Sequence, residues 1–140
     1  MPGTYRVSVW VRDRDSGGAA GNNGGRWDTY ATTAFTLTTC ASVSGASTRR
    51  GATINVTATA SGCPDASPLY QFAVLRPGTS AYQVVQAYSS NPTFTWDTTG
   101  AAPGSYRISI WVRDAASGGA SGNSVGRWDA YDNGTVISLG

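Results

Sequence analysis

The strongest constraint on this chain is an internal repeat. The segment PGTYRVSVWVRDRDSGGAAGNNGGRWDTY at 2–30 recurs as PGSYRISIWVRDAASGGASGNSVGRWDAY at 103–131, with 20 of 29 positions identical. The two copies begin 101 residues apart, which is the size of one β-sandwich module. We therefore expect a complete module at 39–140, preceded at 1–38 by the last two strands of another module, as in a slice of a longer tandem array.

The composition excludes several kinds of catalytic and binding site. Among 140 residues every cation is an Arg and every anion an Asp, while His, Lys and Glu do not occur. Without His, Ser-His-Asp, Cys-His and His-metal sites are excluded, and paired Asp residues alone favour neither enzymatic activity nor a cofactor. The net charge of +2 gives little reason to expect a nucleic-acid partner. No apolar run approaches the roughly 18 residues of a membrane span, so no membrane insertion is predicted.

Apolar and polar residues alternate with a period of two, which predicts strands. Seven short strands are expected in the complete module, at 40–45, 52–60, 69–76, 82–88, 92–98, 104–113 and 127–139. The last is expected to bend at Asn133-Gly134. This spacing predicts an all-β fold, a seven-stranded antiparallel sandwich preceded by an extra β-hairpin from the partial repeat.

The segment GAAPGSYRISIWV at 100–112 resembles the Pro-Gly-x-Tyr-x-φ-x-φ segment (φ apolar) of fibronectin type III and related bacterial immunoglobulin-like repeats. The resemblance implies a tyrosine corner, a Tyr whose hydroxyl bonds the backbone upstream, at Tyr106 and at Tyr5 in the partial copy. The segment 40–139 looks like modules found in tandem in bacterial secreted and surface proteins. Such modules serve as spacers, adhesive units or accessory domains beside enzymes, so the resemblance specifies fold better than function.

The two cysteines, Cys40 and Cys63, flank the first two predicted strands. If these strands form a hairpin about the turn near Gly51, facing residues have numbers that sum to about 103, which places Cys40 opposite Cys63. A disulfide is predicted, with two buried free thiols as the alternative, and it implies an oxidising compartment. Two Cys without His offer too few soft ligands for zinc, and they lie too close together for the inter-sheet pair of antibody domains.

Alternation divides the sixth predicted strand into two faces. Tyr106, Ile108, Ile110 and Val112 are expected to face the core, so the residues between them are expected to point outward. The candidate interaction face comprises these outward residues and the start of the last strand: Arg107, Trp111, Arg113, Arg127, Trp128, Asp129 and Tyr131. The partial copy repeats it as Arg6, Trp10, Arg12, Arg26, Trp27, Asp28 and Tyr30.

Two interpretations of this face compete. Flat aromatic rings suit the apolar faces of sugars, and Arg and Asp supply planar hydrogen bonding, so the face is a candidate glycan or protein platform. Alternatively, Trp and Arg stack across the strands and cover the sheet or pack against the next module, which is the preferred interpretation.

The Gly-rich segment at 114–126 is expected to be a flexible hairpin tip, with Asp114 and Asp129 exposed near its two ends. Asp13 and Asp15 in the earlier copy weakly resemble the start of a calcium loop. However, Ala116 replaces Asp15 in the complete module and no Glu closes the loop, so no metal site is predicted.

Together these features predict a non-catalytic repeat, extracellular or on the cell surface, that acts as a structural spacer or adhesive module of a bacterial surface or secreted protein. The alternatives are a carbohydrate-binding module and a self-assembling fibre subunit. The expected partners are neighbouring modules, a glycan, a surface protein, or another copy bound through 1–38. An isolated two-stranded hairpin is marginal in water, so the hairpin at 1–38 is expected to be disordered, packed on its own module, or paired edge to edge with that of another chain.

Overall fold

The computed structural model describes residues 3–140, except for the side chain of Leu37, and every regular element in that range is a β-strand. The described chain contains no helix long and apolar enough to cross a membrane. It divides into two compact units, Gly3–Leu37 and Thr38–Gly140.

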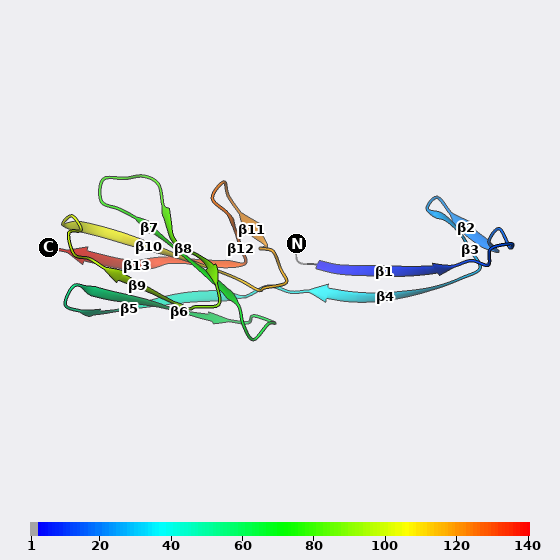
Figure 1. The fold of residues 1–140 in the computed structure, drawn as a ribbon, viewed down its shortest axis with the longest axis horizontal. Coiled ribbons are helices and arrows are strands. Elements are labelled where there is room, and N and C mark those ends of the chain that lie inside the picture. Colours follow the sequence, from blue (N-terminus) through cyan, green and yellow to red (C-terminus); the bar gives the residue numbers. More distant parts are fainter. Residues whose placement is uncertain (1–2) are drawn as a thin grey trace. The chain divides into compact units, whose positions relative to one another are not determined.

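The larger unit contains two main antiparallel sheets and one short two-stranded sheet (Figure 1). The four-stranded sheet has the order β13-β10-β7-β8, and the three-stranded sheet has the order β5-β6-β9. The bounds in the first sheet are Ala130–Leu139 for β13, Gly104–Arg113 for β10, Leu69–Leu75 for β7 and Gln83–Ser89 for β8. Those in the second are Ser42–Arg50 for β5, Thr53–Ser61 for β6 and Thr93–Asp97 for β9.

The two sheets bury one common core, which is consistent with a β-sandwich. Ile54 and Val56 of β6 belong to the same buried cluster as Ile108 and Ile110 of β10. Aromatic rings bridge the sheets, with Phe72 and Phe94 5.9 Å apart and Trp96 and Tyr106 4.8 Å apart between ring centroids. The inward face predicted for β10 is confirmed, because Tyr106, Ile108, Ile110 and Val112 are all buried.

The tyrosine corner implied at Tyr106 is present. The Tyr106 hydroxyl donates a hydrogen bond to the carbonyl of Ala102, four residues upstream, at 2.8 Å. In the partial copy Tyr5 occupies the matching position, and the residue that matches Ala102 is Met1, which lies outside the described residues.

The first predicted strand was too short. Sequence alternation ended it at Gly45, but β5 runs to Arg50 and pairs with β6 along its whole length, up to Arg50↔Thr53. Beyond Gly45 its side chains are exposed, so the hairpin is held there by its backbone ladder and leaves no apolar pattern in the sequence. Gly51 makes the tight turn with a φ of +60°.

The predicted hairpin register and disulfide are confirmed. Ser42 faces Ser61 and Arg50 faces Thr53, so the ladder, extended outward, brings the two cysteines together. Cys40 and Cys63 form a disulfide, and Cys40 is buried.

The bend predicted at Asn133-Gly134 is a β-bulge. The β10–β13 register passes from Ile108↔Thr135 to Ile110↔Asp132, which leaves two residues of β13 opposite one of β10. Asp132 uses this bend to reach the other sheet, where its Oδ2 accepts a hydrogen bond from the Gly45 amide at 2.9 Å.

The smaller unit is a hairpin of β1 (Gly3–Val11) and β4 (Thr29–Leu37), with a short second hairpin in the connection between them (Figure 1). That second hairpin pairs β2 (Ala20–Asn22) with β3 (Gly25–Trp27). In the larger unit β11 (Ser121–Gly122) and β12 (Arg127–Trp128) pair in the same way between β10 and β13. The single last strand predicted at 127–139 is therefore divided at Asp129, where the chain passes from pairing with β11 to pairing with β10. The Asp129 amide donates to the carbonyl of Val112 in β10 at 2.8 Å.

Candidate functional site

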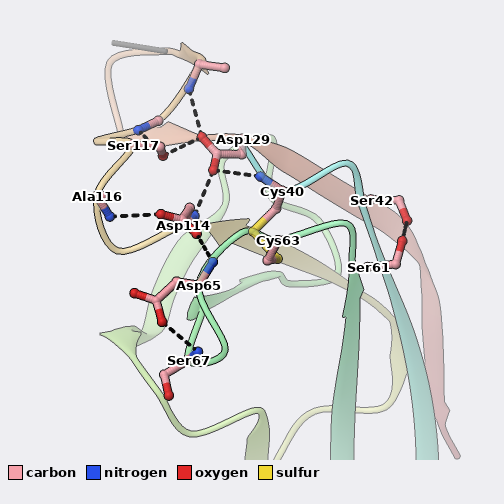
Figure 2. The surroundings of a disulfide bond; sticks show 12 residues. Cys40, Ser42, Ser61, Cys63, Asp65, Ser67, Asp114, Ala116, Ser117 and Asp129 are labelled. Atoms are coloured by element: carbon pink, nitrogen blue, oxygen red, sulfur yellow. Dashed lines mark hydrogen bonds between the residues drawn. A yellow bond between two sulfur atoms is a disulfide. The ribbon is translucent and has the colours of Figure 1, made fainter. Parts of the chain in front are cut away.

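One carboxylate organises the end of the larger unit at which the chain enters it (Figure 2). Asp129 Oδ2 accepts hydrogen bonds from the backbone amides of Asp114 at 2.7 Å and Cys40 at 3.1 Å. Its Oδ1 accepts from the Ser117 hydroxyl at 2.7 Å and the Ala120 amide at 3.0 Å. Asp129 therefore joins the entering chain, the end of β10 and the Gly-rich loop.

Asp114 extends the same network. The prediction that it lies in exposed, flexible surroundings was wrong. Only 2% of Asp114 is exposed. Its Oδ2 accepts from the Asp65 amide at 2.7 Å, and its Oδ1 accepts from the Ala116 amide at 3.0 Å (Figure 2). The carboxylates of Asp114 and Asp129 are thus engaged by backbone amides, which is a structural use of charge.

The Gly-rich loop is not a free hairpin tip, because Ser117 and Ala120 bond Asp129. Gly126 and Trp128 lie against Trp111 on the outer side of β10. Gly119 has a φ of +93° and packs so tightly that a Cβ would lie 2.7 Å from that of Arg127, so this position needs glycine. We refer to residues 114–128 as the covering loop.

The covering loop, together with the neighbouring strand β7, buries Trp111, which was predicted to be exposed. Trp111 is only 5% exposed, and its ring centroid lies 4.5 Å from that of Trp128 at an interplanar angle of 47°. Its Nε1 donates to the Ser109 hydroxyl at 2.8 Å, so Ser109, also predicted to face outward, is buried with it. The prediction that pairing brings Trp128 near Trp111 is confirmed, but the predicted outward exposure of Trp111 was wrong.

Two arginines of the predicted face contact neighbouring protein groups. The Arg113 guanidinium lies over the ring of Tyr88, 4.3 Å from its centroid. Arg127 donates to the carbonyl of Gly119 at 2.9 Å and so braces the covering loop. Arg107 is exposed. The interpretation in which aromatic and Arg side chains cover the sheet therefore fits this face better than an open Trp platform.

Tyr88 is a residue of this region that alternation missed. Its hydroxyl donates to the carbonyl of Arg127 at 2.7 Å, which ties β8 to the covering loop. Burial raises the pKa of Tyr88 to about 12, opposed by the positive charge of Arg113. The sequence placed Tyr88 at the end of a predicted strand and gave no sign that it reaches a loop 39 residues away.

The first copy builds the same local structure. Asp28 accepts from the Asp13 amide at 2.7 Å, the Ala19 amide at 3.0 Å and the Ser16 hydroxyl at 2.6 Å. The Ser16 hydrogen bond, followed by that of the Asp13 amide, holds the pKa of Asp28 below its ordinary value.

The side chains around Asp28 also match those of the larger unit. Trp10 and Trp27 lie 4.5 Å apart between ring centroids, and Arg26 donates to the carbonyl of Gly18 at 2.8 Å. Tyr30, Arg6 and Arg12 are exposed on the same hairpin.

A shallow hollow of about 240 Å³ remains beside the covering loop. Trp128 and Tyr131 line it in an edge-to-face contact, 5.6 Å apart at 73°, and Tyr131 is 55% exposed. The other lining residues are Tyr82, Ser109, Trp111, Asn123 and Asn133. The hollow combines aromatic walls with amide groups, so it can accept a small polar ligand that also carries an apolar face.

A second hollow of about 570 Å³ is lined mainly by residues near the edge strands β8 and β9. Its walls include Val74, Val85, Phe94, Trp96 and Tyr106. Because Phe94 and Trp96 pack against the core, this hollow is a side opening of the core. Arg76 and Asp97 are the charged residues in its lining.

Within residues 3–140, no three His, Cys, Asp or Glu side chains come together in a way that could hold a metal ion. Comparisons with protein-family models, with curated proteins and with solved structures give no match.

Replacing Asp129 by Asn is expected to loosen the covering loop. The amide nitrogen of Asn cannot accept two of the four hydrogen bonds, so stability should fall by about 2 kcal/mol, the scale of bonds to a charged acceptor. Thermal unfolding and amide hydrogen exchange at Ala120 measure the effect. Asp28→Asn is the matched control, since it weakens the corresponding loop bonds in the first copy and should leave unfolding of the larger unit unchanged. Unaltered exchange at Ala120 in Asp129→Asn would contradict this role.

Alkaline pH is expected to weaken the tie made by Tyr88. Because the pKa is about 12 in the folded protein and ordinarily 10.0, the folded state keeps the proton that the unfolded state releases. The contribution of Tyr88 is therefore complete below pH 10 and declines as the pH rises toward 12. Tyr88→Phe should flatten this decline in urea unfolding series, and one late tyrosinate transition near 295 nm should disappear. An identical titration curve in the variant would refute the assignment.

Proposed function

We propose that this protein is a non-catalytic, extracellular immunoglobulin-like repeat that acts as a structural spacer or adhesive module of a bacterial surface or secreted protein. The division into β5-β6-β9 and β13-β10-β7-β8, with a tyrosine corner at the start of β10, supports the fibronectin type III-like assignment. The absence of His, Lys and Glu from the sequence, and the engagement of Asp114 and Asp129 by amides, favour a structural role over catalysis.

The observation that carries the spacer role is the pair of contacts that hold Cys40 at the entry of the larger unit. We call the Asp129 carboxylate and the Cys40–Cys63 disulfide together the clamp. Strand β4 ends at Leu37, and Cys40 is already fixed by the Asp129 carboxylate and the disulfide. Only Thr38 and Thr39 lie between. The chain is therefore held firmly as soon as it enters the larger unit, as a module that transmits tension along a chain requires.

The disulfide also supports the extracellular location. Structural disulfides persist in oxidising compartments and are rare in the cytosol. The pair lies in the same clamp, so the unit is reinforced where tension along the chain would enter it.

Single-molecule pulling from the two chain ends tests the spacer role. The larger unit should unfold with a resolvable force peak, and its extension should increase on reduction of the disulfide. The disulfide spans 23 residues, which corresponds to about 8 nm of extended chain. Cys63→Ser supplies the reduced reference without reductant. Unfolding without a force peak would argue against a spacer that carries tension.

The hollow beside the covering loop favours a second candidate, carbohydrate binding. A pyranose presents an apolar face that stacks on an aromatic ring and hydroxyls that bond amides. Here Tyr131, Trp128 and Tyr82 supply the rings, and Asn123 and Asn133 supply the amides. The buried Trp111 contributes to the floor and is not the exposed platform.

Fluorescence titration with soluble oligosaccharides tests this candidate. Binding should change the emission of Trp128, and Tyr131→Ala should weaken binding at least about tenfold, or about 1.4 kcal/mol. Tyr30→Ala is the matched control, since Tyr30 is equally exposed but lies in the first copy. Equal responses in both variants would remove the hollow from consideration as a sugar site.

A further inference from the structure

The hairpin of the smaller unit has an exposed apolar face. The matching face in the larger unit is buried in the core. Val7, Val9 and Val11 lie on one face of β1, and Val9 is 59% exposed. The residues at the same repeat positions in β10 are Ile108, Ile110 and Val112, and each has 0% exposure. The same face therefore exists twice, once inside a core and once exposed.

The edge of the hairpin repeats this contrast. In the larger unit β10 pairs with β13 on one side and with β7 on the other, from Arg107↔Leu75 to Arg113↔Leu69. Within residues 3–140, β1 pairs with β4 alone. By repeat position, Arg6–Val11 of β1 and the adjoining Arg12 offer the backbone groups that β10 uses to bind β7.

The hairpin is already shaped for such a partner. The edge-to-face pair of Trp27 and Tyr30 has its centroids 5.6 Å apart at 71°, against 5.6 Å and 73° for Trp128 and Tyr131. The carboxylate of Asp28 holds its loop as that of Asp129 does. Docking would therefore order little that is not ordered already.

We infer that the hairpin Gly3–Leu37 docks onto a five-stranded scaffold of the kind formed by β5 to β9, with β1 in the place that β10 takes in the larger unit. The partner presents an apolar surface like that of Val43, Ile54 and Phe72. It also presents a free strand edge equivalent to the edge of β7 that β10 occupies in the larger unit. This inference concerns how repeats join and does not depend on the spacer or the sugar-binding proposal.

The scaffold within this chain is reserved for its own hairpin. In β13 Asp132 bonds the Gly45 amide across the sheets, whereas the residue opposite Val9 in the first copy is Ala31, which cannot accept that bond. The bulge at Asn133-Gly134 has no counterpart either, since β1 and β4 pair without a register shift. The first hairpin lacks these two features, so it is expected to bind a scaffold that is free rather than to displace β10 and β13.

The test mixes the intact chain with a probe polypeptide of residues 38–103, which carries the scaffold and lacks β10 and β13. Size exclusion with light scattering should give a 1:1 complex, and the amide spectrum of labelled probe should become that of a folded sheet. Val9→Asp in the intact chain should weaken the complex at least about tenfold, because it buries an unpaired carboxylate. Ala34→Asp is the matched control, since the matching residue, Val136, is half exposed in the larger unit.

A second variant decides the matter if the probe aggregates alone. Ile110→Asp disables β10 in the intact chain and leaves each molecule with one competent hairpin and one empty scaffold. It should form folded dimers or larger assemblies by reciprocal docking, and adding Val9→Asp should abolish them. Absence of a complex with the probe, together with unfolded or monomeric Ile110→Asp, would overturn the inference.

Two other occupants of the face give distinct results. If the unmodified chain dimerises through a contact that Val9→Asp removes, a second hairpin covers the face and the inference is wrong. If Val9→Asp lowers the unfolding temperature of the larger unit in the monomer, the chain's own module covers it and the inference is equally wrong.

Discussion

The acceptance of four hydrogen bonds by the Asp129 carboxylate is the interaction on which the rest of the larger unit depends. Its partners come from the entering chain at Cys40, the end of β10 at Asp114, and the covering loop at Ser117 and Ala120. Bonds to a carboxylate are stronger than neutral ones, so one side chain can hold segments that are far apart in sequence. The disulfide, the covering loop and the Trp111–Trp128 pair all lie where this network places them.

Comparison of the two copies distinguishes contacts that form within the hairpin from burial that requires the neighbouring strands. The carboxylate bonds and the Trp contact form in both copies, so residues of the hairpin suffice for them. Burial differs, because Trp10 is 40% exposed and Trp111 is 5% exposed. The additional cover over Trp111 requires the strands that pair beside β10, which the smaller unit does not contain.

Period-two alternation was sufficient to predict the inner face of β10 and the hairpin register that joins Cys40 to Cys63. It failed for Trp111, because alternation reports which side of a sheet a residue faces and not whether something covers that side. The sequence did contain a relevant signal, because Asp, Ser and Gly recur at matching loop positions in both copies. A flexible tip does not need the same residue at each of these positions. The length of β5 was not predictable, because its outer half is held by backbone pairing and carries no apolar pattern.

The covering loop also changes where recognition is possible. A ligand cannot stack on Trp111, so any binding surface moves to the loop and the rim of β13, where Tyr131 and Asn123 lie. Loop residues can vary without disturbing the inner face of β10, because inner and outer faces use alternate positions of one strand. The two faces of the hairpin therefore differ in their surroundings. The inner face packs in the core, and the outer face lies beneath the loop that Asp129 holds, with Tyr131 exposed at its rim.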